Sequence, residues 1–220
     1  MSTAIYPQEL IEQKVARIYE DFQKPDLVVY DCRNCEINEM IKKTPAYQGL
    51  IVLWDENNGK PRIVFVGYSN CIRKRVRQYF QDSERNATLK RHIGDAFLNK
   101  DGFDKKTLDF WWDYQNEHND VNYEIIEKKY IKIVRDYIKN NLSFVTVQIK
   151  NAGMHEKIAK KILATLSHCE YFVNDDWLGN YSTHREVRES GLWAMRTFRS
   201  KDIMEDDDFE YLEKCLRGEE

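Results

Sequence analysis

An arginine and a glutamate lie where chemistry on phosphate could use them. Arg75 is part of the basic run RKRVR, and Glu156 lies near the start of the run MHEKIAKKILATL. Breaking a phosphodiester requires an activated water and a positive group that stabilises the charge gathering on the phosphate oxygens. A guanidinium offers two parallel N–H donors for that charge, and a carboxylate can bind a hard divalent ion such as Mg²⁺. Arg75 is a candidate charge stabiliser, with one more exposed arginine as the alternative. Glu156 is a candidate metal ligand, with a glutamate favoured by the dipole at a helix start as the alternative.

Two tyrosines and a histidine are candidates for the group that activates water. Tyr79 follows Arg75 by four residues, so a helix would place both on one side, and Tyr68 ends an apolar run. Either tyrosine can act as a base only if its pKa is depressed. His155 has a suitable unperturbed pKa and ranks third. Each residue also has an ordinary structural explanation, such as a half-buried packing role for the tyrosines.

A local excess of positive charge favours a polyanionic partner. The whole chain has a formal net charge of −3, but residues 62–91 carry eight basic side chains against two acidic ones. Such a field suits nucleic acid. The alternative is a solvated helix face that acidic residues elsewhere compensate. The side chains expected to contact phosphate are Arg73, Lys74, Arg77, Lys90, Arg91 and His92.

The hydrophobic pattern predicts the elements that must position these residues. Apolar residues at three- and four-residue spacings indicate a helix over residues 7–24, and two apolar runs around an Asn-Gly turn indicate a β-hairpin over residues 48–68. A helix carrying the arginine run should follow the hairpin, capped by Ser69 or Asn70. Further along, the pattern predicts a polar and aromatic insertion at 82–141 with helices at 88–98 and 122–139, a strand at 144–149 and a helix at 154–168.

Cysteine usage and hydropathy limit the class of protein. The chain has five cysteines, an odd number, and the Cys32 and Cys35 pair lacks the second pair that a structural zinc site needs. We expect reduced thiols rather than a disulfide framework. No leader-like segment opens the chain, and no apolar run is long enough to span a membrane. A soluble cytoplasmic protein is expected.

Five positions in register resemble the motifs of the GIY-YIG nuclease superfamily. Gly49-Leu50-Ile51 occupies the place of the first motif, and Phe65-Val66-Gly67 that of the second. Arg75 lies eight residues after the second glycine, where the family has its catalytic arginine. Tyr79 stands where members carry His or Tyr, and Glu156 fits the metal-binding glutamate. The resemblance covers about 49–193, and Ile51 and Phe65 replace the two motif tyrosines.

The resemblance implies a fold and an activity. The implied fold is α/β (α+β), with a small three-stranded mixed sheet flanked by helices, and with residues 82–141 as a helical insertion. The implied organisation is a helical extension at 1–45, a nuclease-like domain at 46–200 and an acidic tail at 201–220. The implied activity is hydrolysis of DNA with one divalent ion, Mg²⁺ or Mn²⁺. The alternative is a nucleic-acid-binding or interaction module that kept the fold and lost the catalyst.

Overall fold

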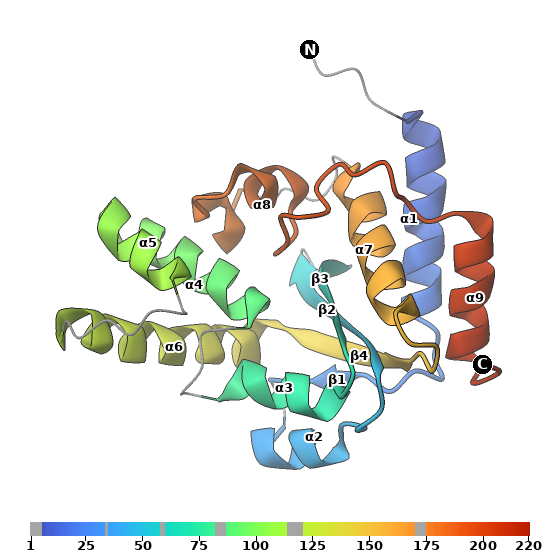
Figure 1. Ribbon diagram of the computed structural model, residues 1–220, viewed down its shortest axis with the longest axis horizontal. Helices are drawn as coiled ribbons and strands as arrows, with labels where there is room; N and C mark the ends of the chain where they lie inside the picture. The colour runs from blue at the N-terminus through green and yellow to red at the C-terminus, as the bar shows by residue number, and fades with distance from the viewer. Residues whose placement is uncertain (1–5, 34, 58–59, 82–86, 114–120, 170–174) are drawn as a thin grey trace.

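The computed structural model describes residues 1–220 except 1–5, 34, 58–59, 82–86, 114–120 and 170–174. A central sheet lies between two layers of helices (Figure 1). In chain order the elements are α1 (Gln8–Phe22), β1 (Tyr30–Asp31), α2 (Ile37–Lys43), β2 (Gly49–Asn57), β3 (Lys60–Ser69), α3 (Ile72–Phe80), α4 (Thr88–Lys100), α5 (Lys105–Trp112), α6 (Val121–Asn141), β4 (Ser143–Gln148), α7 (Met154–Ser167), η2 (Leu178–Tyr181), α8 (Arg185–Ser190) and α9 (Asp206–Leu216).

The sheet confirms the expected α+β core and adds one strand to it. Its order is β1-β4-β2-β3, so the expected hairpin and the expected third strand share one sheet. The fourth strand is the two-residue β1, where Tyr30 stacks on Phe144 of β4 with ring centroids 4.7 Å apart. The sheet is not mixed, because β2 pairs antiparallel with β3 and with β4, and β4 pairs antiparallel with β1. Since β3 and β4 both run opposite to β2, they run in the same direction.

Side chains alternate between two cores on opposite faces of the sheet. One core contains Ile51 and Leu53 of β2 with the buried faces of α3, α4 and α6. The other contains Leu50 and Val52 with α1, α7 and α9. We call these the α3 face and the α7 face. Figure 1 shows α7 with α1 and α9 on one side of the sheet, and α3 on the other.

The described part of the insertion is mostly helical, and it packs against the α3 face. Trp111 is 1% exposed, and it lies so close to Gly94 of α4 that a Cβ there would meet the indole at 2.0 Å. Phe110 is buried and Trp112 is half-buried, so most of the expected aromatic cluster is in the core. Lys90 is fully buried, and its ammonium donates to the carbonyls of Gln78 and Gln81 at the end of α3. This contact ties the insertion to the arginine helix.

The acidic C-terminal stretch is a packed helix rather than an open tail. Phe209, Leu212 and Cys215 of α9 are buried in the core of the α7 face. Lys14 of α1 pairs with Glu205 at 3.0 Å, and Arg17 pairs with Glu213 at 2.8 Å. The buried Lys161 of α7 donates to Asp208 at 2.6 Å. The acidic side chains of this stretch therefore join it to α1 and to α7.

Candidate active site

The arginine helix and the glutamate helix begin at the same end of the sheet. Helix α3 follows β3, and α7 follows β4. Because β3 and β4 run in the same direction, both helices start beside the first residue of β2, Gly49, which pairs with Ser69 of β3 and Gln148 of β4. Arg75 is the fourth residue of α3, and Glu156 is the third residue of α7. The candidate residues thus share one end of the sheet.

They nevertheless lie on opposite faces. The buried side of α3 belongs to the core with Ile51, whereas the buried side of α7 belongs to the core with Leu50. Arg75 is therefore on the α3 face, and Glu156 is on the α7 face. A phosphate that meets both must lie over the end of the sheet rather than over either face.

Glu156, Lys160 and Tyr68 form one polar group on the α7 face. Lys160 donates to the Glu156 carboxylate at 2.6 Å, and the Tyr68 hydroxyl lies near the same carboxylate. The interaction with Lys160, and then that with Tyr68, lowers the pKa of Glu156. Burial, and then the interaction with Glu156, raises the pKa of Tyr68. Glu156 is therefore an anion, and Tyr68 a phenol donor, at neutral pH.

His155 lies beside this group but is turned into the protein. It is 7% exposed, and its ring meets Tyr68 edge to face with centroids 5.7 Å apart. Its Nδ1 is buried and has no hydrogen-bond partner among the described residues. The imidazole therefore packs against Tyr68, and its Nδ1 is not exposed to solvent.

Tyr79 is a core residue on the α3 face. It is 3% exposed, and a Cβ on Gly67 would lie 3.0 Å from its hydroxyl oxygen, so the glycine is what lets this ring approach β3. Burial raises the pKa of Tyr79 to about 12, although the nearby Arg75 opposes the rise. This environment works against Tyr79 as a base. Arg75 itself is half-buried, and its guanidinium has no hydrogen bond or ion pair with the described residues.

A tyrosine that sequence reasoning missed lies on the Arg75 face. Tyr47 packs against the core of the α3 face, and its hydroxyl shares a 2.9 Å hydrogen bond with Thr146 of β4. Its carbonyl accepts the Ile72 amide at 2.9 Å, which connects it to the start of α3. The signal was its place two residues before Gly49, in phase with Ile51. Strand alternation puts such positions on one face.

Gly49 and the residues just before α3 have backbone surroundings that limit which side chains fit there. A Cβ on Gly49 would lie 1.9 Å from the Val147 carbonyl oxygen, so only glycine fits where β2 meets β4. The N-cap residue of α3 is Cys71, without a side-chain cap. Ser69 does not cap the helix directly, because its hydroxyl bonds to the backbone of Cys71, accepting from its N–H at 3.1 Å. The expected cap at Ser69 or Asn70 was therefore misplaced.

The expected phosphate-binding residues divide into exposed and occupied ones. Lys74 and Arg77 are exposed on α3 and have no partner among the described residues. Arg73 uses its Nε to donate to the Thr44 carbonyl at the end of α2, 2.7 Å away. The Arg91 guanidinium lies over the Trp112 ring, 5.4 Å from its centroid. Lys74 and Arg77 are thus the cations of this set that are open to a polyanion.

Two of the residues that were expected to contact phosphate are buried. Lys90 is 0% exposed and His92 is 1% exposed, so neither presents its charge or ring at the surface. Burial lowers the pKa of His92 to about 3, helped by His184 and Arg91, which keeps the imidazole neutral. Its ring packs against Trp112 and His184, at centroid distances of 5.1 and 5.8 Å. These two positions do not match the expected role in phosphate binding.

The donor set at Glu156 fits a divalent ion that keeps most of its water. The described residues contain no cluster of three or more His, Cys, Asp or Glu side chains that could enclose a metal. Glu156 offers one partly exposed carboxylate, and its partner Lys160 is an exposed side chain that can move aside. Mg²⁺ commonly binds through one or two carboxylates, water and substrate phosphate. Glu156 would hold such an ion with few other protein ligands.

Comparison with known proteins places the chain in a family. A family model described as a GIY-YIG domain matches residues 55–219. The match includes β3, Arg75, Tyr79 and Glu156, and it begins after Gly49-Leu50-Ile51. The comparisons with curated proteins and with solved structures give no match. Among the described helices, none is long and apolar enough to cross a membrane.

Proposed function

The chain belongs to the GIY-YIG domain family, and from that premise we propose that it is a divalent-metal-dependent endonuclease that hydrolyses DNA phosphodiester bonds. The observation that carries the proposal is the convergence of two helix starts on one end of the sheet. One brings Arg75, and the other brings Glu156 next to Tyr68. A charge stabiliser, a metal ligand and a hydroxyl are the groups that phosphodiester hydrolysis requires.

Each group has one role in this proposal. Glu156 holds Mg²⁺ or Mn²⁺, which when bound supplies a Lewis acid for the phosphate oxygens and for water. Arg75 approaches the same phosphate from the α3 face and stabilises its developing negative charge through paired N–H donors. Lys74 and Arg77, exposed on the same helix, bind the neighbouring phosphates.

In this proposal the water is oriented by a tyrosine hydroxyl, which acts as a base only in the alkaline range because burial raises the pKa of both candidates, Tyr68 and Tyr47. Tyr68 contacts Glu156 directly, so an ion held by that carboxylate would lie beside the phenol. Tyr47 is the second candidate, because its hydroxyl is on the Arg75 face. Neither Ile51 nor Phe65, at the two motif positions, has a hydroxyl to contribute.

A catalytically inactive nucleic-acid-binding module is the second candidate function. It is favoured by the same two replaced positions and by the burial of Tyr79, whose pKa is raised to about 12. On this alternative, Lys74 and Arg77 bind nucleic acid while Arg75 and Glu156 remain as parts of the inherited fold.

One experiment separates the two candidates. Purified protein is incubated with supercoiled plasmid, flap and single-stranded DNA in Mg²⁺, in Mn²⁺ and in EDTA. Metal-dependent cutting that Arg75→Ala removes supports the endonuclease. Binding without cutting on every substrate supports the inactive module.

A cytoplasmic location is part of the proposal, because all five cysteines are free thiols, as is usual in a reducing compartment.

A further inference from the structure

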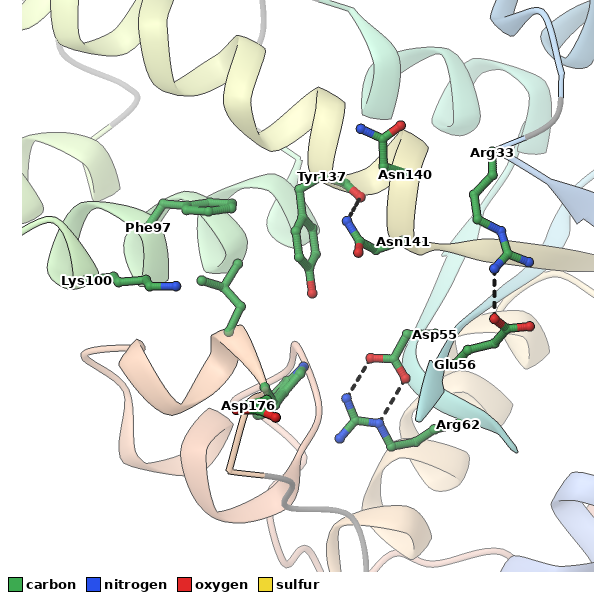
Figure 2. Close-up of a pocket in the computed structure, with 12 residues that line it drawn as sticks. Arg33, Asp55, Glu56, Arg62, Phe97, Lys100, Tyr137, Asn140, Asn141 and Asp176 are labelled. Carbon is green, nitrogen blue, oxygen red and sulfur yellow. Dashed lines mark hydrogen bonds and ion pairs between the residues drawn. The ribbon is translucent and has the colours of Figure 1, made fainter. Parts of the chain in front are cut away.

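A pocket lies at the opposite end of the sheet from Glu156. Its cavity is about 480 Å³, within the usual range of small-ligand sites. The turn end of the β2–β3 hairpin forms one wall, with Asp55, Glu56 and Arg62. The ends of α4 and α6 form another wall, and residues 176–178 a third (Figure 2). About six residues of β2 separate Asp55 from Gly49, which is roughly 20 Å along a strand.

The floor of the pocket is a fixed ion pair. Arg62 donates to Asp55 through Nε at 3.0 Å and through Nη2 at 2.6 Å, and Arg62 is 4% exposed. The guanidinium also lies over the Trp177 ring, 5.1 Å from its centroid. A buried charged pair keeps its geometry because moving either partner would leave the other uncompensated. The floor is therefore rigid and polar.

The walls are aromatic. Phe97 and Tyr137 meet edge to face with centroids 5.6 Å apart, and Trp177 and Leu178 line the facing segment. Figure 2 shows the Tyr137 hydroxyl directed into the open centre between Asp55 and α4. That hydroxyl makes no hydrogen bond with the described residues. The pocket thus combines apolar ring surface from Phe97 and Tyr137 with a hydroxyl, in a lining that otherwise consists mostly of charged and amide side chains.

The rim carries a carbonyl oxygen and a cation. Asn141 uses its amide nitrogen to donate to the Tyr137 carbonyl at 2.9 Å, which leaves its side-chain oxygen toward the pocket (Figure 2). Lys100 is an exposed cation at the end of α4, where its ammonium lies 5.0 Å from the centroid of the Tyr181 ring. An acceptor, a donor and a cation therefore surround the aromatic walls.

We propose that this pocket binds a nucleobase together with its attached phosphate. The rings of Phe97 and Tyr137 offer apolar surface to a base, the Tyr137 hydroxyl and the Asn141 oxygen meet its polar edge, and Lys100 meets the phosphate. The inference draws on the proposed DNA substrate but concerns a separate site, which acts in binding and not in cutting. The base can come from a nucleic-acid strand or from a free nucleotide.

The test measures ligand binding in assays that do not depend on cleavage. Isothermal titration calorimetry is run with the four deoxynucleoside monophosphates, and fluorescence anisotropy with a short single-stranded oligonucleotide and its fully abasic counterpart. Three variants are compared with the wild-type protein: Tyr137→Phe, which removes only a hydroxyl, Lys100→Ala, and Lys132→Ala as an exposed lysine on α6 outside the pocket. Plasmid cleavage is measured on the same samples.

We expect the base-containing ligand to bind more tightly than the abasic one, and Tyr137→Phe and Lys100→Ala each to weaken it about five- to tenfold. Lys132→Ala should bind as the wild type does. Binding of monophosphates identifies a free nucleotide as a source, and binding of the oligonucleotide alone identifies the strand. Equal affinity for base-containing and abasic ligands, or equal affinity of all variants, overturns the proposal. Since cleavage is scored separately, its loss or retention bears on the endonuclease and not on this pocket.

Discussion

The Tyr68 hydroxyl, at the end of β3, and the Glu156 carboxylate, in the first turn of α7, lie close enough to shift each other's pKa. This contact links β3 to the helix that carries Glu156. It adds to two larger effects, because Lys160 lowers the pKa of the carboxyl and burial raises the pKa of the phenol. An ion bound by Glu156 would compete with Tyr68 and Lys160 for the same oxygens.

Glu156→Gln should abolish cleavage while leaving DNA affinity unchanged. The amide removes the negative charge that holds the ion, but the exposed cations of α3 are untouched. The checks are plasmid nicking, Mn²⁺ binding followed by electron paramagnetic resonance, and duplex binding by anisotropy. Glu210→Gln, on the exposed side of α9, is the matched control. Normal cutting by Glu156→Gln would remove this residue from the proposed mechanism.

Arg75→Ala should slow cleavage about a hundredfold or more, the scale seen when one preorganised charge stabiliser is lost. Arg75→Lys should recover only part of the rate, because an ammonium lacks the paired donors of a guanidinium. Single-turnover cleavage with saturating protein gives the rate without the contribution of binding. Arg217→Ala, at the C-cap of α9, is the control, and a similar slowing there would argue for a general charge effect.

Removing a hydroxyl should identify the base. Tyr68→Phe is expected to slow cleavage more than Tyr79→Phe, because only Tyr68 contacts Glu156 and Tyr79 is buried. Since the pKa of Tyr68 is raised, its phenolate forms only in the alkaline range, and the rate should still be rising there. Tyr47→Phe tests the second candidate hydroxyl, which lies on the α3 face. If all three variants cut at the wild-type rate and profile, water activated by the metal becomes the better account.

DNA affinity should depend on Lys74 and Arg77. Each alanine variant should weaken duplex binding similarly for all sequences and reduce the slope of log affinity against log salt by about one. Arg73→Ala should instead lower the melting temperature, because its guanidinium fixes the end of α2. Anisotropy titrations at two salt concentrations, with thermal unfolding of the same samples, measure both effects. Binding that does not respond to salt would contradict the electrostatic account.

Acid should destabilise the protein through His92. Its folded-state pKa is lowered to about 3, so between pH 6.5 and 3 the unfolded chain binds a proton that the folded chain does not. Stability therefore falls as the pH drops through this window, by about 2 kcal/mol between pH 7 and 5. His92→Phe should remove this part of the slope, whatever its effect at pH 7. Urea unfolding at the two pH values provides the measurement, and an unchanged slope would be the contrary result.

The periodic elements were predictable because local pattern determines them. The hairpin, the arginine helix and the helix from Met154 all form where apolar spacing placed them. The short strand β1 was not predictable in this way. Its two residues join the sheet through the stacking of Tyr30 on Phe144, a contact between segments far apart in the chain.

The sequence predicted that Arg75 and Glu156 lie on the helices after the hairpin and after the third strand, but it did not predict how the side chains around them are arranged. Spacing along a helix does not show whether a charged side chain faces solvent or the end of another helix. Lys90 does the latter, because its ammonium donates to a carbonyl at the end of α3. His92 was expected at the surface for the same reason and lies in the core. Tyr47 was missed because the position of its hydroxyl depends on a hydrogen bond to Thr146. That residue is on β4, which follows the whole insertion in the chain.

The central position of β2 determines where this chain can be shortened. Residues 49–54 of β2 pair with β3 on one side and with β4 on the other, yet they precede the family match at residue 55. A fragment that starts at residue 55 would separate β3 from β4 and expose both cores, and it would also lose the helix α1 against which α9 packs. Recombinant fragments intended to preserve this domain must therefore begin upstream of α1, because the boundary of sequence similarity is not the boundary of cooperative folding.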